Sequence, residues 1–243
     1  MQLVYSTWVE VRDYLEHSKG IIIPAGSCEQ HGPTGMIGTD AICAQTVAVG
    51  IGRKLGVMVG PLINVGMSVH HLAFPGTVTL LPSTLLLVVR DTVLALARHG
   101  FERFFFVNGH GGNMPTLKAS FSEVYARANE GTALRCKAVN WWEALRVVEK
   151  CRELFGDQDG MHATASELSL AMFAHPDREK SGVLDPPCAV TDDFYGPDDF
   201  RRRFPDGRIG SNPKLADLDR GRQVYEAAVD DIAEMYSAFL NDK

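Results

Sequence analysis

The apolar run Phe104-Phe105-Phe106-Val107 constrains the fold more than any other stretch of this sequence. A short run without polar residues is typical of a central strand that is covered on both faces, as in parallel sheets flanked by helices. The run ends in Asn108-Gly109-His110-Gly111-Gly112-Asn113. Open α/β sheets place their ligand sites at the carboxyl ends of strands. We therefore expect an α/β fold with a candidate site at His110.

Strand and helix patterns alternate along the chain. We expect strands over 21–26, 57–65, 101–107 and 134–139, and helices over 6–18, 40–55, 83–100, 114–129, 144–154, 162–173 and 219–239. The segment 180–210 is rich in Asp, Pro, Gly and Arg, and we expect it to be irregular. This alternation predicts a three-layer α/β/α sandwich with a mainly parallel sheet. No linker-like stretch interrupts the sequence, so we expect a single domain spanning residues 1–243.

The composition of the chain argues against two classes of binding partner. The formal net charge of −6 offers no basic surface for nucleic acid or for anionic membranes. We find no apolar run long enough to span a bilayer and no basic region followed by an apolar core at the N-terminus. The sequence therefore predicts a cytoplasmic protein with no nucleic-acid or membrane partner.

The cysteines are scattered, odd in number and without a pair at two-residue spacing: Cys28, Cys43, Cys136, Cys151 and Cys188. This pattern indicates neither a disulfide framework nor a zinc ribbon. Cys28 lies beside candidate metal ligands and could coordinate a metal. The favoured interpretation is a small buried residue that faces away from Glu29.

A candidate metal site follows the first expected strand. Glu29 and His31 are two residues apart, so in an extended segment their side chains point the same way. Asp40 closes the glycine-rich loop that follows and can fold back toward them. Two carboxylates and an imidazole are suitable ligands for Zn or Mn. The alternative is a polar turn in which Asp40 caps a helix, and this stretch alone leaves both interpretations open.

Further candidates lie in other loops. The segment 66–77 contains Gly, Pro and adjacent histidines, which is typical of an ordered loop, and loops carry the chemistry of rigid α/β scaffolds. We expect Ser68 and His71 of this loop, together with Trp142, to bind substrate, although a histidine pair also occurs in ordinary turns. His162 and Glu167 are expected near the first turns of a helix, where Glu167 could alternatively serve only the helix dipole.

Five motifs occur together in one order: Glu29-Gln30-His31-Gly32-Pro33, Gly38-Thr39-Asp40, Phe74-Pro75-Gly76-Thr77, Asn108-Gly109-His110-Gly111-Gly112-Asn113 and His162-Ala163. With them the chain resembles the creatininase (creatinine amidohydrolase) family from about Ile21 to the final helix. The resemblance implies a creatininase-like fold and two divalent metal ions, Zn and/or Mn, with Fe as a further candidate. It implies the ligands Glu29, His31, Asp40 and His110, with Asp40 as the bridge. It also implies that His162 is catalytic and that the protein is a homo-oligomer, commonly a hexamer in this family.

The chain departs from creatininase itself at three places. Gly112 stands where creatininase has another glutamate ligand, and we hypothesise that Glu167 supplies the missing carboxylate. Gln158 replaces a tryptophan that packs on creatinine, which makes creatinine a less favoured substrate. Thr164-Ala165 replaces the usual Gly-Glu after His-Ala.

The leading functional hypothesis is a metal-dependent amidohydrolase. It would cleave the C–N bond of a small cyclic amide or a formamide by metal-activated hydroxide, with His162 delivering a proton to the departing nitrogen. One alternative is a metallopeptidase of the same family. Another is a non-catalytic oligomeric binding protein that kept the fold, because a fold does not fix a function.

Overall fold

The protein is described by a computed structural model over residues 1–128, 133–186 and 189–242. Its centre is a four-stranded sheet in the order β2-β1-β3-β4, in which every pair is parallel. The strands are β1 (Gly20–Ala25), β2 (Met58–Val59), β3 (Arg103–Asn108) and β4 (Arg135–Asn140). The three longer strands end in register at Ala25, Asn108 and Asn140, so the loops that follow them start at one edge of the sheet.

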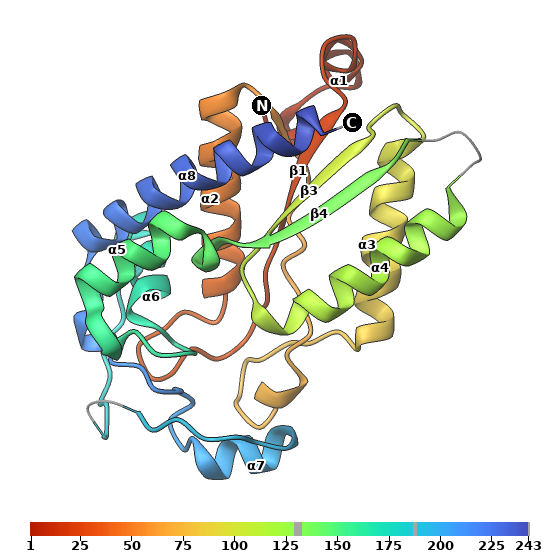
Figure 1. Ribbon diagram of the computed structural model, residues 1–243. Coiled ribbons are helices and arrows are strands. Elements are labelled where there is room, and N and C mark those ends of the chain that lie inside the picture. Colours follow the sequence, from red (N-terminus) through yellow and green to blue (C-terminus); the bar gives the residue numbers. More distant parts are fainter. Residues whose placement is uncertain (129–132, 187–188, 243) are drawn as a thin grey trace.

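Helices cover both faces of this sheet (Figure 1). They are α1 (Trp8–Leu15), α2 (Thr39–Leu55), α3 (Pro82–Ala97), α4 (Met114–Arg127), α5 (Leu145–Phe155), α6 (Ala165–Ala174), α7 (Gly196–Arg203) and α8 (Leu218–Asn241). Short 3-10 segments occupy several loops: η1 (Leu3–Tyr5), η2 (Val69–His71), η3 (Gly111–Asn113), η4 (Trp141–Glu143), η5 (Gly156–Gln158), η6 (Pro176–Arg178) and η7 (Pro213–Leu215).

Alternating side chains of the central strands fill two separate cores. Phe105 and Ile22 pack on the side of α2, α5, α6 and α8. Phe104 and Phe106 point the other way, toward α3 and α4. All three phenylalanines are fully buried, and each buried side chain of this size contributes about 1.5–3 kcal/mol relative to exposure. The predicted parallel sheet between two helical layers is confirmed.

Several boundaries differ from those predicted. The strand expected over 57–65 stops at Val59, because Gly60 and Pro61 follow and proline has no N–H for the ladder. The helix expected from His162 begins only at Ala165, where Thr164 forms a capping box with Glu167. The segment 180–210 was expected to be irregular but contains α7.

Further predictions concern the end of one helix, the cysteines and membrane-spanning segments. The predicted helix end at residue 129 and the cysteine at position 188 lie outside the described residues. Cys28, Cys43, Cys136 and Cys151 are free. Within the described ranges, no helix combines the length and the apolar character needed to cross a bilayer.

Candidate metal centre

The candidate centre lies where α2 begins beside the carboxyl edge of the sheet. Asp40 is the second residue of α2 and is almost fully buried. Gly109, just beyond β3, allows this approach, because a Cβ at position 109 would lie 2.2 Å from the carbonyl oxygen of Asp40. The expected competition between capping and ligation does not arise, since Gly38 occupies the cap position and Asp40 makes no cap hydrogen bond.

One carboxylate oxygen of Asp40 faces a first group of ligands. His110 Nδ1 lies 3.3 Å from Asp40 Oδ2 and 3.2 Å from Glu29 Oε1. Glu29 is fully buried in the loop that follows β1, and His110 follows β3. The two strand ends therefore bring a glutamate and a histidine to the same side of Asp40.

The other oxygen of Asp40 faces a second group. His31 Nε2 lies 3.1 Å from Asp40 Oδ1 and 3.8 Å from Glu167 Oε1. Glu29, His31 and Asp40 also offer ligand atoms that all lie within 4.8 Å of one another. Asp40 is therefore placed between two clusters, each with one further carboxylate and one imidazole.

Hydrogen bonds orient both imidazoles. His110 Nε2 lies 2.9 Å from the carbonyl oxygen of Met67, and His31 Nδ1 lies 3.1 Å from the carbonyl oxygen of Glu29. A carbonyl only accepts, so each of these nitrogens carries the proton and donates it. The opposite nitrogens, His110 Nδ1 and His31 Nε2, are left to face Asp40, as is usual for histidines that bind metals.

The buried carboxylates of this region favour the binding of a cation. Glu29 Oε1 and Asp40 Oδ2 are buried and accept no hydrogen bond from the described residues. Burial opposes ionisation of His31, but the carboxylates of Asp40 and Glu167 raise its pKa to about 10. Burial likewise opposes the charged form of Glu29, yet His110 and His71 hold its pKa well below the usual range. Mixed nitrogen and oxygen donors with orphaned carboxylate oxygens fit Zn or Mn.

The structure explains the departure at Gly112. A Cβ at this position would lie 2.5 Å from His110 Nε2 and 2.7 Å from the carbonyl oxygen of Met67, so a side chain there would break the bond that orients His110. Glu167 instead approaches from α6, on the side of His31. It also accepts a 2.6 Å hydrogen bond from the backbone N–H of Thr164, so it caps the helix and faces the centre at once.

Gln30 fixes the position of His162, a contribution that the sequence did not reveal. Gln30 Nε2 lies 2.9 Å from both His71 Nδ1 and the carbonyl oxygen of Gly207, which uses both of its N–H groups. His162 Nε2 in turn donates to the carbonyl oxygen of Gln30 at 2.9 Å. This leaves His162 Nδ1 unprotonated and 3.7 Å from Glu29 Oε1. Burial, with His71 and His31 nearby, lowers the pKa of His162 well below its usual value.

The residues expected to bind substrate fall into two groups. Ser68 is fully buried and donates a hydrogen bond to Glu29 Oε2, so it supports a candidate ligand. His71 and Trp142 line a cavity of about 760 Å³ that opens over Asp40, Glu167 and His162. The part of Ser68, His71 and Trp142 in substrate binding stays a prediction.

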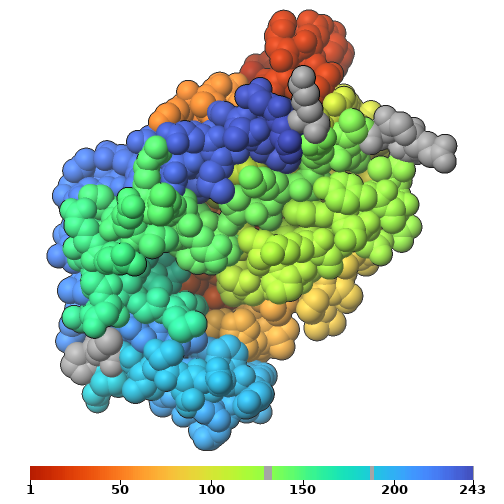
Figure 2. All heavy atoms as spheres, in the orientation of Figure 1, coloured from red at the N-terminus to blue at the C-terminus, as the bar shows by residue number. Residues whose placement is uncertain are grey.

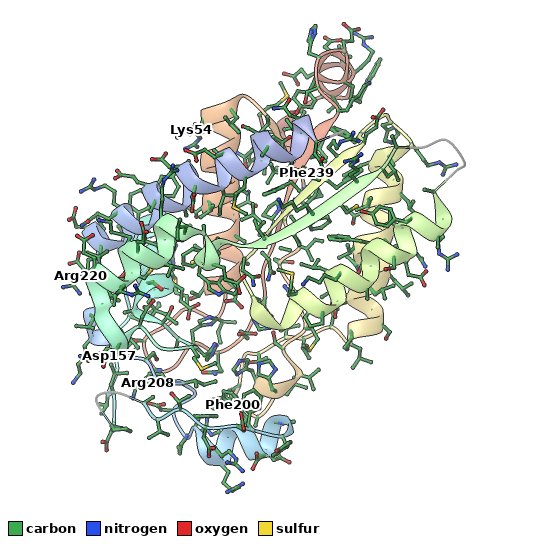
Figure 3. The ribbon with its side chains drawn as sticks, in the orientation of Figure 1. Lys54, Asp157, Phe200, Arg208, Arg220 and Phe239 are labelled. Atoms are coloured by element: carbon green, nitrogen blue, oxygen red, sulfur yellow. The ribbon has the colours of Figure 1, made fainter. Side chains whose placement is uncertain are left out.

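The cavity has a wall that the sequence did not indicate. Phe194 lines it, and Phe200 of α7 packs behind, with its ring centroid 4.6 Å from that of His71. Figure 3 labels Phe200 below the loops that follow the sheet. Figure 2 shows the opening as a hollow, with atoms of the N-terminal part of the chain at its floor. No spacing pattern in the segment 180–210 indicates this role, because it depends on contacts distant in sequence.

Comparison with known proteins places this chain in one family. The sequence model of the family described as "Creatininase: Creatinine amidohydrolase" matches residues 5–236. The chain therefore belongs to the creatininase family, whose members are hydrolases.

Particular relatives differ in substrate. Creatinine amidohydrolase of Pseudomonas putida is 26% identical over 88% of this chain and 87% of its own length. Mycofactocin precursor peptide peptidase of Mycobacterium ulcerans (strain Agy99) is 27% identical over 87% of this chain and 82% of its own. 3-Dehydro-scyllo-inosose hydrolase of Thermotoga maritima is 28% identical over 69% of this chain and 54% of its own length.

Solved structures of creatininase share the whole fold. One, a creatininase Mn form, superposes with a TM-score of 0.87 at 23% identity, covering 99% of both chains. A creatininase variant of the Zn–Zn type gives a TM-score of 0.88 at 23% identity, covering 99% of this chain and 98% of the other. These likenesses confirm the predicted creatininase-like fold.

Proposed function

We propose that this protein is a metal-dependent amidohydrolase that cleaves the C–N bond of a small cyclic amide or a formamide by metal-activated hydroxide. Two divalent ions, Zn and/or Mn, would be held by Glu29, Asp40 and His110 on one side and by His31, Asp40 and Glu167 on the other. The observation that carries the proposal is the position of Asp40, whose two carboxylate oxygens face two separate pairs of donors.

The residues around the centre suit such a hydrolysis. When bound, two divalent ions lower the pKa of water to about 7 and polarise a carbonyl oxygen. His162 is neutral because of its lowered pKa, and its Nδ1 is directed toward Glu29. It can therefore accept a proton at Nδ1 and return it to the departing nitrogen, while Gln30 holds the ring in place.

Metal content tests the proposal. Protein purified without chelator or affinity nickel should contain close to two equivalents of Zn, Mn or Fe per chain by elemental analysis. Asp40→Ala should lose both equivalents and all hydrolysis of formamides and cyclic amides, because both clusters share this residue. Asp219→Ala, which changes a first-turn aspartate of α8 that pairs with Arg222, is the matched control and should retain both.

Other metal contents would select other functions. One equivalent per chain with no hydrolysis across an amide panel would select the binding-protein alternative. Absence of bound metal, even after metal is added, would refute the proposal.

A peptidase is the second candidate. A cavity of about 760 Å³ is larger than a small cyclic amide needs, and Gln158 is not among the residues that line it. The peptidase relative from Mycobacterium ulcerans also matches most of this chain. Metal-loaded protein that cleaves short peptides but not formamides or cyclic amides would select this candidate.

A further inference from the structure

One face of α5 forms a wall of the cavity. Val148, Cys151 and Arg152 all line it, and their spacing of three and four residues places them on one side of a helix. Trp142, just before α5, continues the same wall. In Figure 3, the label Asp157 lies just beyond the C-terminal end of α5, and the neighbouring Gly156 lines the cavity. Arg152 is thus an exposed arginine at the rim, on the helix face that meets the cavity.

Arg152 has no carboxylate partner among the described residues. Its neighbours on α5 are paired, since Arg146 lies 2.7 Å from Glu234 and Lys150 lies 2.6 Å from Glu153. Within the described part of the chain, no acidic group lies within ion-pair distance of Arg152. It is also the only arginine or lysine among the described residues that line the cavity.

The acidic residues of the cavity are engaged elsewhere. Asp40 and Glu167 face the candidate metal centre. Asp159 accepts a 2.8 Å hydrogen bond from the backbone N–H of Ser166 at the start of α6. The guanidinium of Arg152 therefore remains available to a molecule in the cavity, and its planar donor fork matches a carboxylate or a phosphate.

We infer that Arg152 binds an anionic group of the substrate, so that the substrate is an amide carrying a carboxylate or a phosphate away from the bond to be cleaved. This inference rests on the proposed function, because it takes the reacting bond to lie at Asp40 and His162. It makes Arg152 a determinant of specificity and leaves the hydrolytic groups unchanged. A neutral cyclic amide such as creatinine would not use it.

Binding of non-hydrolysable acids tests the inference. Succinate, glutarate and adipate each resemble an acid product with a second anionic end, and butyrate, valerate and hexanoate have the same lengths without that end. Calorimetry on metal-loaded protein would measure the affinity of each diacid and of the monoacid of the same length. Both members of a pair carry the carboxylate that is attracted to the metals, so the difference in affinity reports the second carboxylate alone. We expect one diacid to bind about 10- to 100-fold more tightly than its monoacid, as for a hydrogen bond to a charged group.

Variants assign this preference to one residue. Arg152→Gln should abolish the preference for diacids over monoacids, and Arg152→Lys should retain part of this preference. Arg146→Gln, on the same helix but paired with Glu234, is the matched control and should leave it unchanged. Replacing the second carboxylate by a phosphonate, as in 3-phosphonopropionate, would show whether a phosphate-like group is preferred.

Two results would overturn the inference. One is equal binding of diacids and monoacids by the unaltered protein, and the other is a diacid preference that survives in Arg152→Gln. Failure of the proposed function has a different signature, because an Arg152-dependent preference without hydrolysis of any amide would leave a binding protein for acidic molecules.

Discussion

Glu167 caps α6 and is proposed to bind a metal ion, and one pair of substitutions can separate these two roles. Its carboxylate accepts the backbone N–H of Thr164 in a capping box, and the same oxygen lies 3.8 Å from His31 Nε2. Burial also raises its pKa to about 7, so in the metal-free protein the group is partly protonated at neutral pH. A metal ion on the side of His31 would require the charged form.

Glutamine preserves one role and removes the other. In Glu167→Gln the amide oxygen can still accept from Thr164, and burial disfavours the charge that is removed, so the free energy of unfolding of the metal-free protein should not fall. The loss of the negative charge should reduce bound metal from about two equivalents to about one. Glu167→Ala should show the same metal loss and should also lower metal-free stability by about 1 kcal/mol through the lost cap.

Elemental analysis and urea unfolding of the chelated protein measure the two effects. Glu10→Gln and Glu10→Ala are matched controls, because Thr7 and Glu10 form the same capping box at the start of α1. Both controls should keep two equivalents of metal. A Glu167→Gln protein with two equivalents and full activity would refute Glu167 as the substitute for the carboxylate absent at Gly112.

Three further outcomes follow from the same contacts. Zinc binding to chelated protein should release protons, because the raised pKa of His31, about 10, keeps this residue protonated at pH 7, whereas metals bind neutral imidazole. For each proton displaced, the affinity for zinc should rise about tenfold per pH unit between pH 7 and 9. A zinc affinity that calorimetry finds unchanged over this range would contradict the prediction. His162→Ala should keep both metals and lose turnover about 100- to 10,000-fold, so unchanged turnover would exclude proton transfer by His162. Asn113→Ala should lower the free energy of unfolding by about 1–3 kcal/mol in chemical denaturation. The reason is that the Asn113 side chain donates to the carbonyl oxygen of Gly26 and accepts from the N–H of Met67, at 2.9 Å each. An unchanged denaturation midpoint would show that these two hydrogen bonds do not contribute to stability.

The sequence predicted those parts of the fold that local patterns determine. The run from Phe104 to Val107 is a central strand because no position in it tolerates water, and β3 pairs on both sides. The strand predicted over 57–65 was too long because residues 57–63 carry no polar side chain, and apolar content alone does not show where Pro61 interrupts the ladder. The segment that contains α7 carries many charged and turn-forming residues, so its helix is visible only once Phe200 packs against η2.

The sequence predicted site residues most readily where several potential metal ligands lie close together in the sequence. Glu29, His31 and Asp40 share one loop and could be proposed as a group from their spacing. The role proposed for Glu167 followed from the absence of a carboxylate at position 112. The structure adds the reason for that absence, since a Cβ at position 112 would lie 2.5 Å from His110 Nε2.

Arg152 shows why the rest of the site could not be read from sequence. On an amphipathic helix an exposed arginine has the pattern of an ordinary solvent-facing residue, and Arg146 on the same helix is one. The two differ only in what faces them: a glutamate of α8 for Arg146, and the open cavity for Arg152. The specificity that we propose therefore depends on one charge, that of Arg152, which has no carboxylate partner among the described residues once the chain has folded.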